Sequence, residues 1–432
     1  MKKEHKKLQL RWLRLDNAAK IFPAVRRRHW SNVYRQSITL REDVDVKVMQ
    51  SALDVTVKRF PSIAARLRKG MFWYYLQQVA SPPKIREEYS YPLVYMSKEE
   101  MRKCALRVIV YNNRVAIEFF HALTDGNGAL IFLKNLVAEY LEQKHGISIP
   151  FEKGIVDRRI EPLEEELEDC FPKNAGAVPV SRKNTLAWRM YGYPERNGFL
   201  NLTCFKFSAK EALELAHKHN STLTVFISAA IMMALINLQN EKTPIKKQQK
   251  RIKVLIPVNL RKLFPSKTLR NFVLYIIPEV DPRLGEYTFD EICKVIYHKM
   301  GAELTPKYMS RLIATNVNSE QNTLIRLVPL PIKNLVMKAI FDKVGERTSC
   351  LSFSNVGRAE VPEIMNQYIE RFDFILGVQS TAPYNCAMIS YEDTICMNFI
   401  RSIRDAELEK HFYAVLQNLG LHVTVESNRN ER

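Results

Sequence analysis

Apolar residues in the first part of the chain follow two different spacings. From Val44 to Phe60 they return every three or four positions, which places Val48 and Ala52 near one face of a helix. Other short runs alternate apolar and polar residues, as half-buried strands do. These predicted strands are Leu8 to Leu15, Ser31 to Leu40, Arg66 to Leu76, Cys104 to Val110 and Arg114 to Phe120. Asn112-Asn113 separates the last two, which predicts a hairpin.

Helical spacing returns from Gly128 to Lys144, directly after that hairpin. The stretch "FFHALTDG" therefore lies where a strand ends and a helix begins. The corner His121 to Asn127 carries a histidine, an aspartate and a glycine within a few positions.

The second half of the chain also mixes strands and helices. Ser208, and Thr222 or Thr224, stand where N-caps are expected. The predicted helices are Ser208 to His219, Val225 to Leu238, Thr288 to Ala302, Tyr308 to Val317 and Asp405 to Leu419. The predicted strands are Phe199 to Phe207, Ile252 to Leu260, Asn271 to Glu279, Cys350 to Asn355, Arg371 to Gly377, Cys386 to Tyr391 and Thr394 to Ile400.

The periodic patterns stop between the two halves. An acidic run, Glu161 to Asp169, is followed by proline, glycine and small residues, a composition typical of a surface crossover. We therefore predict an α+β protein with an N-terminal subdomain at 1–160, a crossover linker at 161–184 and a C-terminal subdomain at 185–432. Both subdomains are expected to combine mostly antiparallel strands with flanking helices.

Several features indicate a folded protein of the reducing cytoplasm. The apolar run Val225 to Leu238 is shorter than the ~20 residues that cross a bilayer, so a buried helix is expected. The basic N-terminus lacks the apolar core and cleavage site of a secretion signal. The seven cysteines are scattered and never form C-x-x-C, so we predict neither disulfides nor a metal site.

The formal net charge of +19 is compatible with several anionic partners. Zinc-finger, helix-turn-helix and RRM patterns are absent from the sequence, so nucleic acid is not expected as a partner. An anionic membrane surface or a phosphorylated substrate remains open, and each basic run alone is also explained as a solvated face. The run Lys246 to Lys253 is a candidate for contacts with phosphates.

The corner has a direct chemical interpretation. A neutral imidazole at His121 can take a proton from a hydroxyl or a thiol, provided that the ring is held in one orientation and tautomer. Asp125 either orients His121 or turns away and pairs with a cation elsewhere, and the spacing does not decide between the two. The chain has no G-x-S-x-G elbow, Walker loop or G-x-G-x-x-G, so no other motif competes.

Three motifs together resemble a known superfamily. "FFHALTDG" in the first half, "PVNLR" with the later "NF" in the second, and "LSFSNVG" near the C-terminus occur in the order found in CoA-dependent acyltransferases. The chain resembles the chloramphenicol acetyltransferase-like superfamily, and within it the alcohol acetyltransferase branch, which is related to condensation domains. The resemblance implies two subdomains of that type with the active-site channel between them.

The resemblance also implies residue roles. His121 would be the general base that deprotonates the acceptor hydroxyl, and Asp125 would pair with an arginine of the second half, for which Arg261 is the candidate. Gly126 would leave room for the channel. Ser354, Asn355 and Asn271 are candidates for the substrate channel, although Ser354 and Asn355 equally suit an ordinary strand-end turn.

The implied activity is transfer of an acyl group from acyl-CoA, with acetyl-CoA as the expected donor, to a small-molecule alcohol, with no bound cofactor or metal. Two alternatives stay open. One is a condensation-type enzyme that uses a carrier-protein-bound donor, and the other is a non-catalytic binding module. Phe120 stands where condensation domains often have a further histidine, and the D-F-G-W-G string of the plant acyltransferases is missing. An anionic membrane or an acyl-carrier protein is a candidate peripheral partner.

Overall fold

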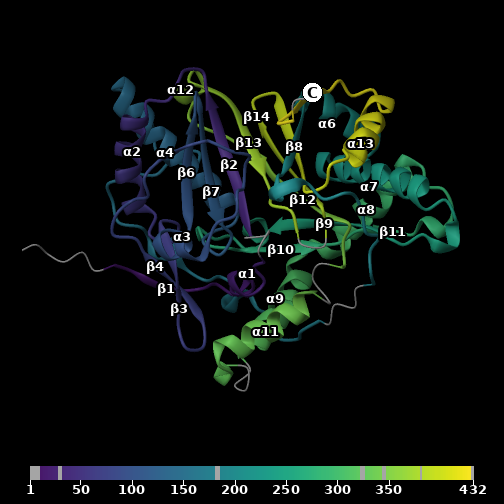
Figure 1. The fold of residues 1–432 in the computed structure, drawn as a ribbon, viewed down its shortest axis with the longest axis horizontal. Coiled ribbons are helices and arrows are strands. Elements are labelled where there is room, and N and C mark those ends of the chain that lie inside the picture. Colours follow the sequence, from purple (N-terminus) through teal and green to yellow (C-terminus); the bar gives the residue numbers. More distant parts are fainter. Residues whose placement is uncertain are drawn as a thin grey trace, which may run out of the picture.

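Two sheet-containing lobes lie side by side, with helices on their outer faces (Figure 1). A computed structural model of the chain describes residues 10–27, 32–180, 185–321, 326–342, 347–379 and 382–429. The predicted α+β architecture with two such lobes is confirmed.

The first lobe contains a five-stranded sheet that carries the corner motif at one strand end. Its order is β13 (Ile369–Ile375), β2 (Val33–Leu40), β7 (Arg114–Phe120), β6 (Leu106–Tyr111) and β5 (Arg86–Glu87). The hairpin between β6 and β7 turns at Asn112, whose φ of 48° is one that asparagine tolerates well. The predicted hairpin is therefore present, and it leads directly to the corner.

The two faces of this sheet differ in polarity because side chains alternate along each strand. Phe119 points toward the helices, where its ring meets Phe132 of α4 (Gly126–His145). α4 packs on α2 (Val46–Arg59), so these two helices cover one face. On the other face Arg35 of β2 lies directly opposite Glu118 of β7. That polar face looks toward the second lobe.

The second lobe is built on an eight-stranded sheet. Its order is β10 (Val273–Ile276), β9 (Ile252–Asn259), β12 (Leu351–Arg358), β14 (Tyr384–Tyr391), β15 (Thr394–Arg401), β8 (Asn201–Ser208) and β16 (Thr424–Ser427), while β11 (Glu279–Val280) pairs with β9. β12 runs parallel to β9 and β14, and the other pairings are antiparallel. The sheet is therefore mostly antiparallel, as expected.

Helices cover the outer side of this sheet, with α7 (Leu223–Lys242) at the centre. The others are α6 (Ala209–Lys218), α8 (Phe289–Glu303), α9 (Pro306–Gln321) and α13 (Glu407–Asn418), whereas α11 (Leu330–Ile340) packs on α1 (Ile21–Ala24). Ser208 caps α6 and Thr222 caps α7, both through side-chain oxygens. α7 is long and apolar enough to cross a membrane, but 72% of its most apolar window is buried against neighbours such as α8 and α13. It is a core helix of this lobe.

Two predicted strands are divided in the structure. The stretch Arg66 to Leu76 forms β3 (Ala65–Lys69) and β4 (Tyr74–Gln78), which pair with each other, and β4 also pairs with β1 (Trp12–Arg14) in a small third sheet. The chain reverses after Gly70, whose N–H donates to the Trp73 carbonyl at 3.0 Å. The stretch Asn271 to Glu279 forms β10 and β11, because Pro278 lacks the N–H that a continuous ladder needs.

The acidic linker is more than a solvated crossover. Glu166 follows the start of the short helix α5 (Glu164–Leu167), and its carboxylate accepts from both terminal nitrogens of Arg59 on α2, at 2.6 and 2.7 Å. Both side chains are buried.

One strand departs from the predicted division of the chain. β13 comes from the 185–432 segment and completes the sheet of the first lobe.

A candidate active site where the two lobes meet

His121 follows β7 and is held between aromatic rings. Its backbone N–H donates to the Asn32 carbonyl at 2.9 Å. Its ring stacks on Phe22, with centroids 4.3 Å apart, and meets Tyr34 edge-on at 4.9 Å. The ring is therefore half-buried and fixed in orientation, as a positioned base requires.

Asn271 sets the tautomer of this ring. The side-chain oxygen of Asn271 lies 3.1 Å from Nδ1 of His121, and its side-chain nitrogen donates to a carboxylate oxygen of Asp16 at 3.2 Å. Because the carboxylate accepts from the amide nitrogen, the amide oxygen faces the imidazole and accepts the hydrogen on Nδ1. Nε2 of His121 then keeps its lone pair free.

Asp16 is a site residue that the sequence analysis missed. It is completely buried, accepts from the backbone N–H groups of Ala19 and Asn271, and lies 3.7 Å from the Arg270 guanidinium. Burial raises the pKa of its carboxyl group. Asp16 and His121 are far apart in the sequence and no motif joins them, so only the folded structure reveals this contact.

Burial lowers the pKa of His121 below its ordinary value of 6.5. Removal of the ring from water disfavours the charged imidazolium, and this effect outweighs the opposing hydrogen bonds and the more distant Asp125. The imidazole is consequently neutral at physiological pH. A free Nε2 on a neutral ring can accept a proton.

Asp125 turns away from His121 and serves two other purposes. One carboxylate oxygen accepts from the backbone N–H groups of Asn127 and Gly128, both at 3.1 Å, and caps α4. The other accepts from Arg261 at 2.7 Å and from the Phe272 N–H at 2.9 Å. Of the two roles left open by the sequence, this geometry matches pairing with a cation and not orientation of His121.

Arg261 is satisfied on every side of its guanidinium group. Besides Asp125, it donates to the side chain of Asn259 and to the backbone carbonyls of Thr268 and Arg270. The side chains of Asp125 and Arg261 are 1% and 9% exposed, so the pair is shielded from solvent and salt. It joins the corner of the first lobe to the segment after β9 in the second.

The two glycines at the start of α4 permit close approach of the second lobe. A Cβ on Gly126 would lie 2.8 Å from a methyl carbon of Val356, so the space beside Gly126 is taken by β12. A Cβ on Gly128 would lie under 3.0 Å from the Thr124 hydroxyl and from the Leu269 carbonyl oxygen. Packing between the lobes, and not an open channel, accounts for glycine at these positions.

Ser354 and Asn355 lie on β12, near this contact. The Asn355 amide donates to the Thr224 hydroxyl at 3.1 Å, and its oxygen accepts from the Gly357 N–H at 2.8 Å. Asn355 therefore supports a local bulge and the start of α7. Ser354 is half-buried beside Ala387 of β14, and among the described hydrogen bonds neither residue contacts His121. Their assignment to a substrate channel stays a prediction.

The candidate phosphate-binding run is only partly available. Lys253 is buried and paired with Glu279, and Arg251 is paired with Glu279 and Asp281. Lys246, Lys247 and Lys250 are exposed. The outward positive charge of this run therefore comes from three lysines.

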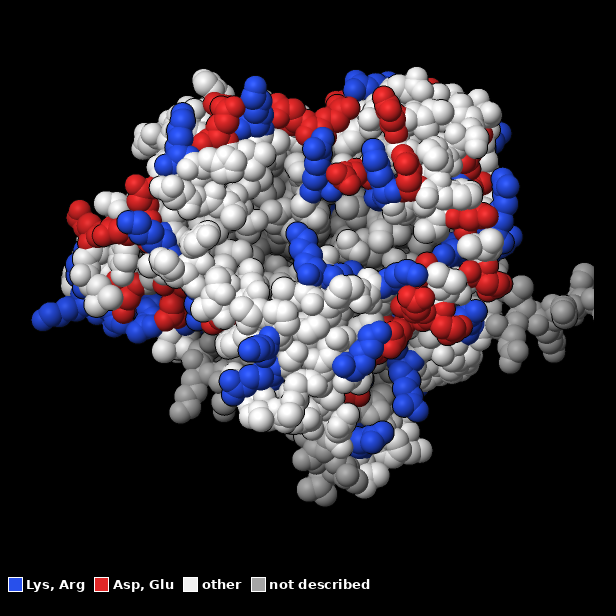
Figure 2. Space-filling view, turned by 180° about the vertical axis from the view of Figure 1, so that it is seen from behind, with Lys and Arg blue, Asp and Glu red and all other residues white. Residues whose placement is uncertain are grey.

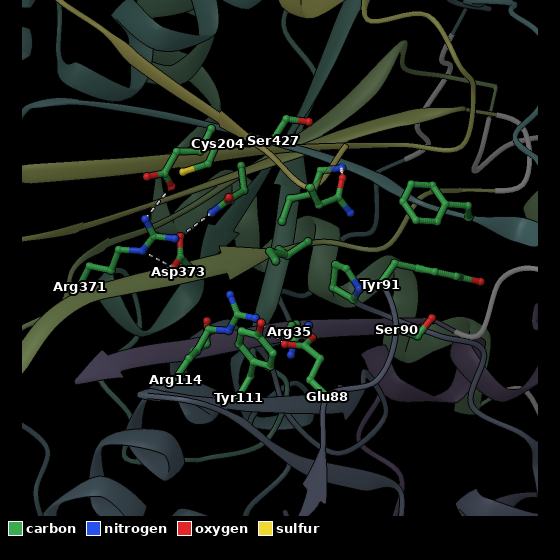
Figure 3. A pocket seen from close by; sticks show the side chains of 18 residues that line it. Arg35, Glu88, Ser90, Tyr91, Tyr111, Arg114, Cys204, Arg371, Asp373 and Ser427 are labelled. Atoms are coloured by element: carbon green, nitrogen blue, oxygen red, sulfur yellow. Dashed lines mark hydrogen bonds and ion pairs between the residues drawn. The ribbon is translucent and has the colours of Figure 1, made fainter. Parts of the chain in front are cut away.

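A cavity of about 450 Å³ lies between the two sheets (Figure 3). Its walls include Arg35 and Arg114 from the first lobe and Cys204 and Asn398 from the second. The space-filling view from behind shows a hollow between the lobes, with basic and acidic side chains at its border (Figure 2). His121 is not part of the cavity wall. The resemblance implied a channel between the subdomains, but none of the residues that line this cavity was a predicted site residue.

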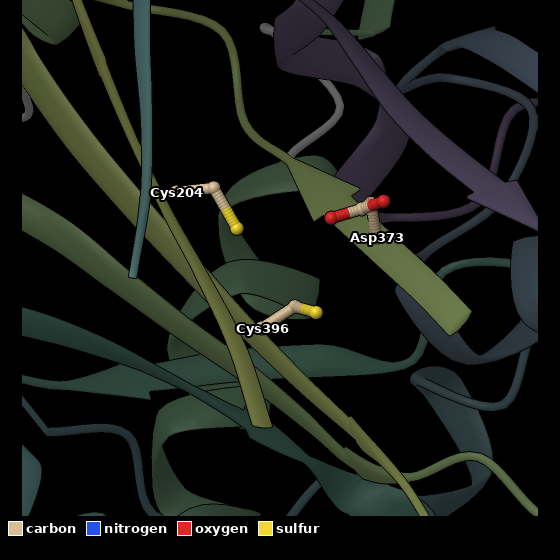
Figure 4. Close-up of side chains that lie close together, drawn as sticks. All are labelled: Cys204, Asp373 and Cys396. Carbon is tan, nitrogen blue, oxygen red and sulfur yellow. The ribbon is translucent and has the colours of Figure 1, made fainter. Parts of the chain in front are cut away.

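One group in the described part of the chain has the donor types of a metal site. The ligand atoms of Cys204, Cys396 and Asp373 lie within 4.8 Å of one another (Figure 4). The hydrogen bond with Cys396 and burial raise the pKa of the Cys204 thiol, and the Arg371 guanidinium lies 2.9 Å from Asp373. A neutral thiol beside an ion pair is a poor site for a cation, so we interpret the group as packing between the lobes.

No family model and no curated protein matches the chain. Solved structures do match over nearly the whole length. TRI3 trichothecene 15-O-acetyltransferase from Fusarium sporotrichioides is 12% identical, with a TM-score of 0.60 over 95% of this chain and 94% of that one. TRI101 of F. sporotrichioides, complexed with coenzyme A and T-2, is 10% identical, with a TM-score of 0.59 over 96% and 99%.

A condensation domain is similar to the same extent. The first condensation domain of the CDA synthetase is 11% identical, with a TM-score of 0.58 over 95% of both chains. At such identities the likeness establishes the fold. The chain has the two-lobed fold of chloramphenicol acetyltransferase-like proteins, so the resemblance is confirmed at this level.

We expect the Asp125–Arg261 pair to behave as a buried ion pair. Asp125→Ala and Arg261→Ala should each lower the free energy of unfolding by about 3–5 kcal/mol, because each leaves an uncompensated buried charge. The double variant should lose less than the sum of the two. Urea denaturation of the four proteins measures this coupling, and strictly additive losses would contradict a direct contact.

Gly128→Ala should destabilise the protein more than Gly126→Ala. The new methyl group at 128 meets a backbone carbonyl that cannot move alone, whereas at 126 it meets the end of a side chain. Overpacking of this kind costs roughly 1–3 kcal/mol. Melting temperatures of the two variants provide the comparison, with Gly301→Ala as a control that has open space around its Cβ. Equal losses at 126 and 128 would argue against the close contact.

Proposed function

We propose that the protein transfers an acyl group from acyl-CoA to a hydroxyl acceptor, with Nε2 of His121 as general base. The observation that carries this proposal is the contact of His121 with Asn271 and, through it, with Asp16. It fixes one tautomer of a neutral ring and leaves Nε2 free. Asp125, which otherwise would be the obvious partner of the histidine, is fully engaged elsewhere.

The chemistry needs little more than this base. Nε2 removes the proton from the acceptor hydroxyl while the hydroxyl oxygen attacks the thioester carbonyl carbon, which forms a tetrahedral intermediate. The carbon–sulfur bond then breaks, and the imidazolium returns the proton to the leaving thiolate. The products are the ester and free CoA, and the reaction involves no oxidation or reduction. Because the thioester is already activated, positioning and proton transfer supply the catalysis.

The structural neighbours support a thioester donor. One is an acetyltransferase, and another was solved with coenzyme A bound. We infer acetyl-CoA as the donor and a small-molecule alcohol as the acceptor. The second candidate is a carrier-bound donor, supported by the likeness to a condensation domain. Phe120 before the motif histidine counts against it. Contact with an anionic membrane or an acyl-carrier protein, and a cytoplasmic location, stay predictions from the sequence.

The proposal is tested by following free thiol with a panel of acyl-CoAs and alcohols. Thiol release that depends on the alcohol is the expected result. Release from carrier-bound acyl groups but from no CoA ester would favour the condensation reaction. Release from neither would leave a non-catalytic binding module.

His121→Ala should lower kcat by roughly 10²–10⁴-fold, the usual contribution of a general base. KM for acyl-CoA and the melting temperature should change little, since the base contributes mainly to the transition state. His298→Ala is the matched control, because His298 is exposed on α8. Near-normal turnover of His121→Ala would exclude the proposed mechanism.

The pH dependence should report the environment of His121. Since burial lowers its pKa below 6.5, the neutral base persists below that pH, and kcat/KM should fall only in more acidic solution. The Asn271 hydrogen bond raises the pKa of His121, so Asn271→Ala should move this acid limb to still lower pH. It should also reduce plateau turnover by roughly 2–10-fold, the effect of one lost hydrogen bond.

Asn355→Ala is the control for this experiment, because its amide supports β12 and makes no described contact with His121. Its acid limb should coincide with that of the wild type. If Asn271→Ala also keeps the wild-type pH profile and plateau, Asn271 does not position the base.

A further inference from the structure

We infer that α11 and the turn between β3 and β4 form a docking surface for a membrane that contains anionic lipids. The sequence left such a membrane open as a partner, and the structure offers a surface for it. The surface has an apolar stripe that faces away from the protein, a fixed place at one end of the molecule, and basic side chains around it. Membrane binding of this kind is independent of acyl transfer.

The polarity of α11 is the reverse of that expected for a helix at a protein surface. Such a helix normally turns its apolar side chains toward the core and its polar ones toward water. In α11 the outward apolar residues follow the spacing i, i+3, i+4, i+7 and i+8, so they share one face. This face, the α11 stripe, consists of Ile332, Leu335, Val336, Ala339 and Ile340. Its four larger side chains are between 50% and 70% exposed.

The polar residues of α11 turn inward instead. Lys333 is buried, with its ammonium group 3.6 Å from the centre of the Trp73 ring, and it donates to the Phe72 carbonyl at 3.1 Å. The Asn334 amide donates to the Tyr74 hydroxyl at 3.0 Å. These contacts fix the rotation of the helix about its axis. A contiguous apolar face that is held toward the outside indicates an interaction site.

The turn between β3 and β4 places a further apolar side chain beside α11. The Leu330 N–H donates to the Met71 carbonyl at 3.0 Å, and the side chain of Met71 is exposed. α11 and this turn project together at one end of the molecule (Figure 1). α11 also packs on α1, whose Phe22 stacks on the ring of His121. The surface therefore adjoins the element that holds the candidate base.

The charged side chains around this surface are mainly basic. Lys69 ends β3, Lys338 lies on α11 and Arg326 precedes it, and none of the three forms a salt bridge with a described carboxylate. Asp342, just after α11, is paired with Arg27. The sequence has no Asp or Glu at 66–84 or at 322–341. Basic side chains beside an apolar face are attracted by anionic lipid headgroups.

A lipid bilayer matches the α11 stripe better than another protein does. All members of the stripe are aliphatic, and their side chains have no hydrogen-bonding group. Centres of protein interfaces are instead enriched in aromatic residues and arginine. A helix that lies on a membrane inserts such an apolar face at the boundary of headgroups and acyl chains, with basic residues beside it. The parts of the chain outside the described ranges are poor candidates, since none has more than two consecutive apolar residues.

The test measures binding to vesicles. The purified full-length protein is sedimented with vesicles of phosphatidylcholine alone, or with vesicles of an equimolar mixture of phosphatidylcholine and phosphatidylserine. We expect at least about 10-fold stronger binding to the mixed vesicles, because several basic side chains meet anionic headgroups there. High salt should reduce this difference by screening the charges.

Two variants separate the apolar contribution from the charge. Leu335→Gln should weaken binding to the mixed vesicles roughly 10-fold, because it removes one large apolar side chain from the stripe. Lys338→Gln should weaken it roughly 5-fold and leave binding to phosphatidylcholine unchanged. Leu284→Gln is the matched control, since Leu284 is an exposed leucine on the short helix Pro282–Leu284 after β11. Melting temperatures should stay at the wild-type value, because none of these side chains is buried.

Three results of the vesicle experiment would overturn the inference: no sedimentation with the mixed vesicles, equal binding to both kinds of vesicle, or unchanged binding of Leu335→Gln. Sedimentation velocity without lipid tests the other occupants. A dimer that Leu335→Gln dissociates, together with absent vesicle binding, would assign the stripe to a second copy of the chain. A monomer that binds no vesicles would leave the stripe to a different protein, and the membrane assignment would again be wrong.

Discussion

One buried carboxylate, that of Asp125, is shared between the two lobes and fixes how they meet. Asp125 uses one oxygen to begin α4 in the first lobe and the other to hold Arg261 and the Phe272 N–H of the second. A carboxylate removed from water is costly unless its oxygens are paired and hydrogen-bonded, and both oxygens of Asp125 are. The start of α4, the end of β7 and the segment after β9 are therefore fixed relative to one another.

The segment from Thr268 to Phe272 extends this constraint to the rest of the molecule. Arg270 donates to the Arg14 and Leu167 carbonyls, and the Leu269 carbonyl accepts from the Thr124 hydroxyl at 2.5 Å. The neighbouring Asn271 holds the ring of His121. The candidate base is thus positioned by the same contacts that dock the lobes, and a loss of docking would also release the imidazole.

Local sequence patterns predicted much of the fold, but they did not predict contacts between residues that are far apart in the sequence. Helix α2 followed from its spacing, α6 and α7 from their caps, and the corner from the end of β7. Arg261 was found through the resemblance. Asp16 was missed because its partners Asn271 and Arg270 lie more than 250 residues away. The turn after Gly70 was missed because alternation continues across it. The cavity depends on facing sheets, which no single stretch of sequence describes.

Strand β13, which comes from the second half of the chain but completes the sheet of the first lobe, has a consequence during synthesis of the chain. β2 pairs with β7 on one side and with β13 on the other, but β13 lies more than 300 residues after β2. At ~5–20 residues per second, synthesis of that interval takes tens of seconds. During this time the edge of β2 has its backbone N–H and C=O groups available to other chains. The first lobe therefore leaves the ribosome with β2 as an unpaired edge strand. This edge is covered only after residues 369–375 have been synthesised and pair with it.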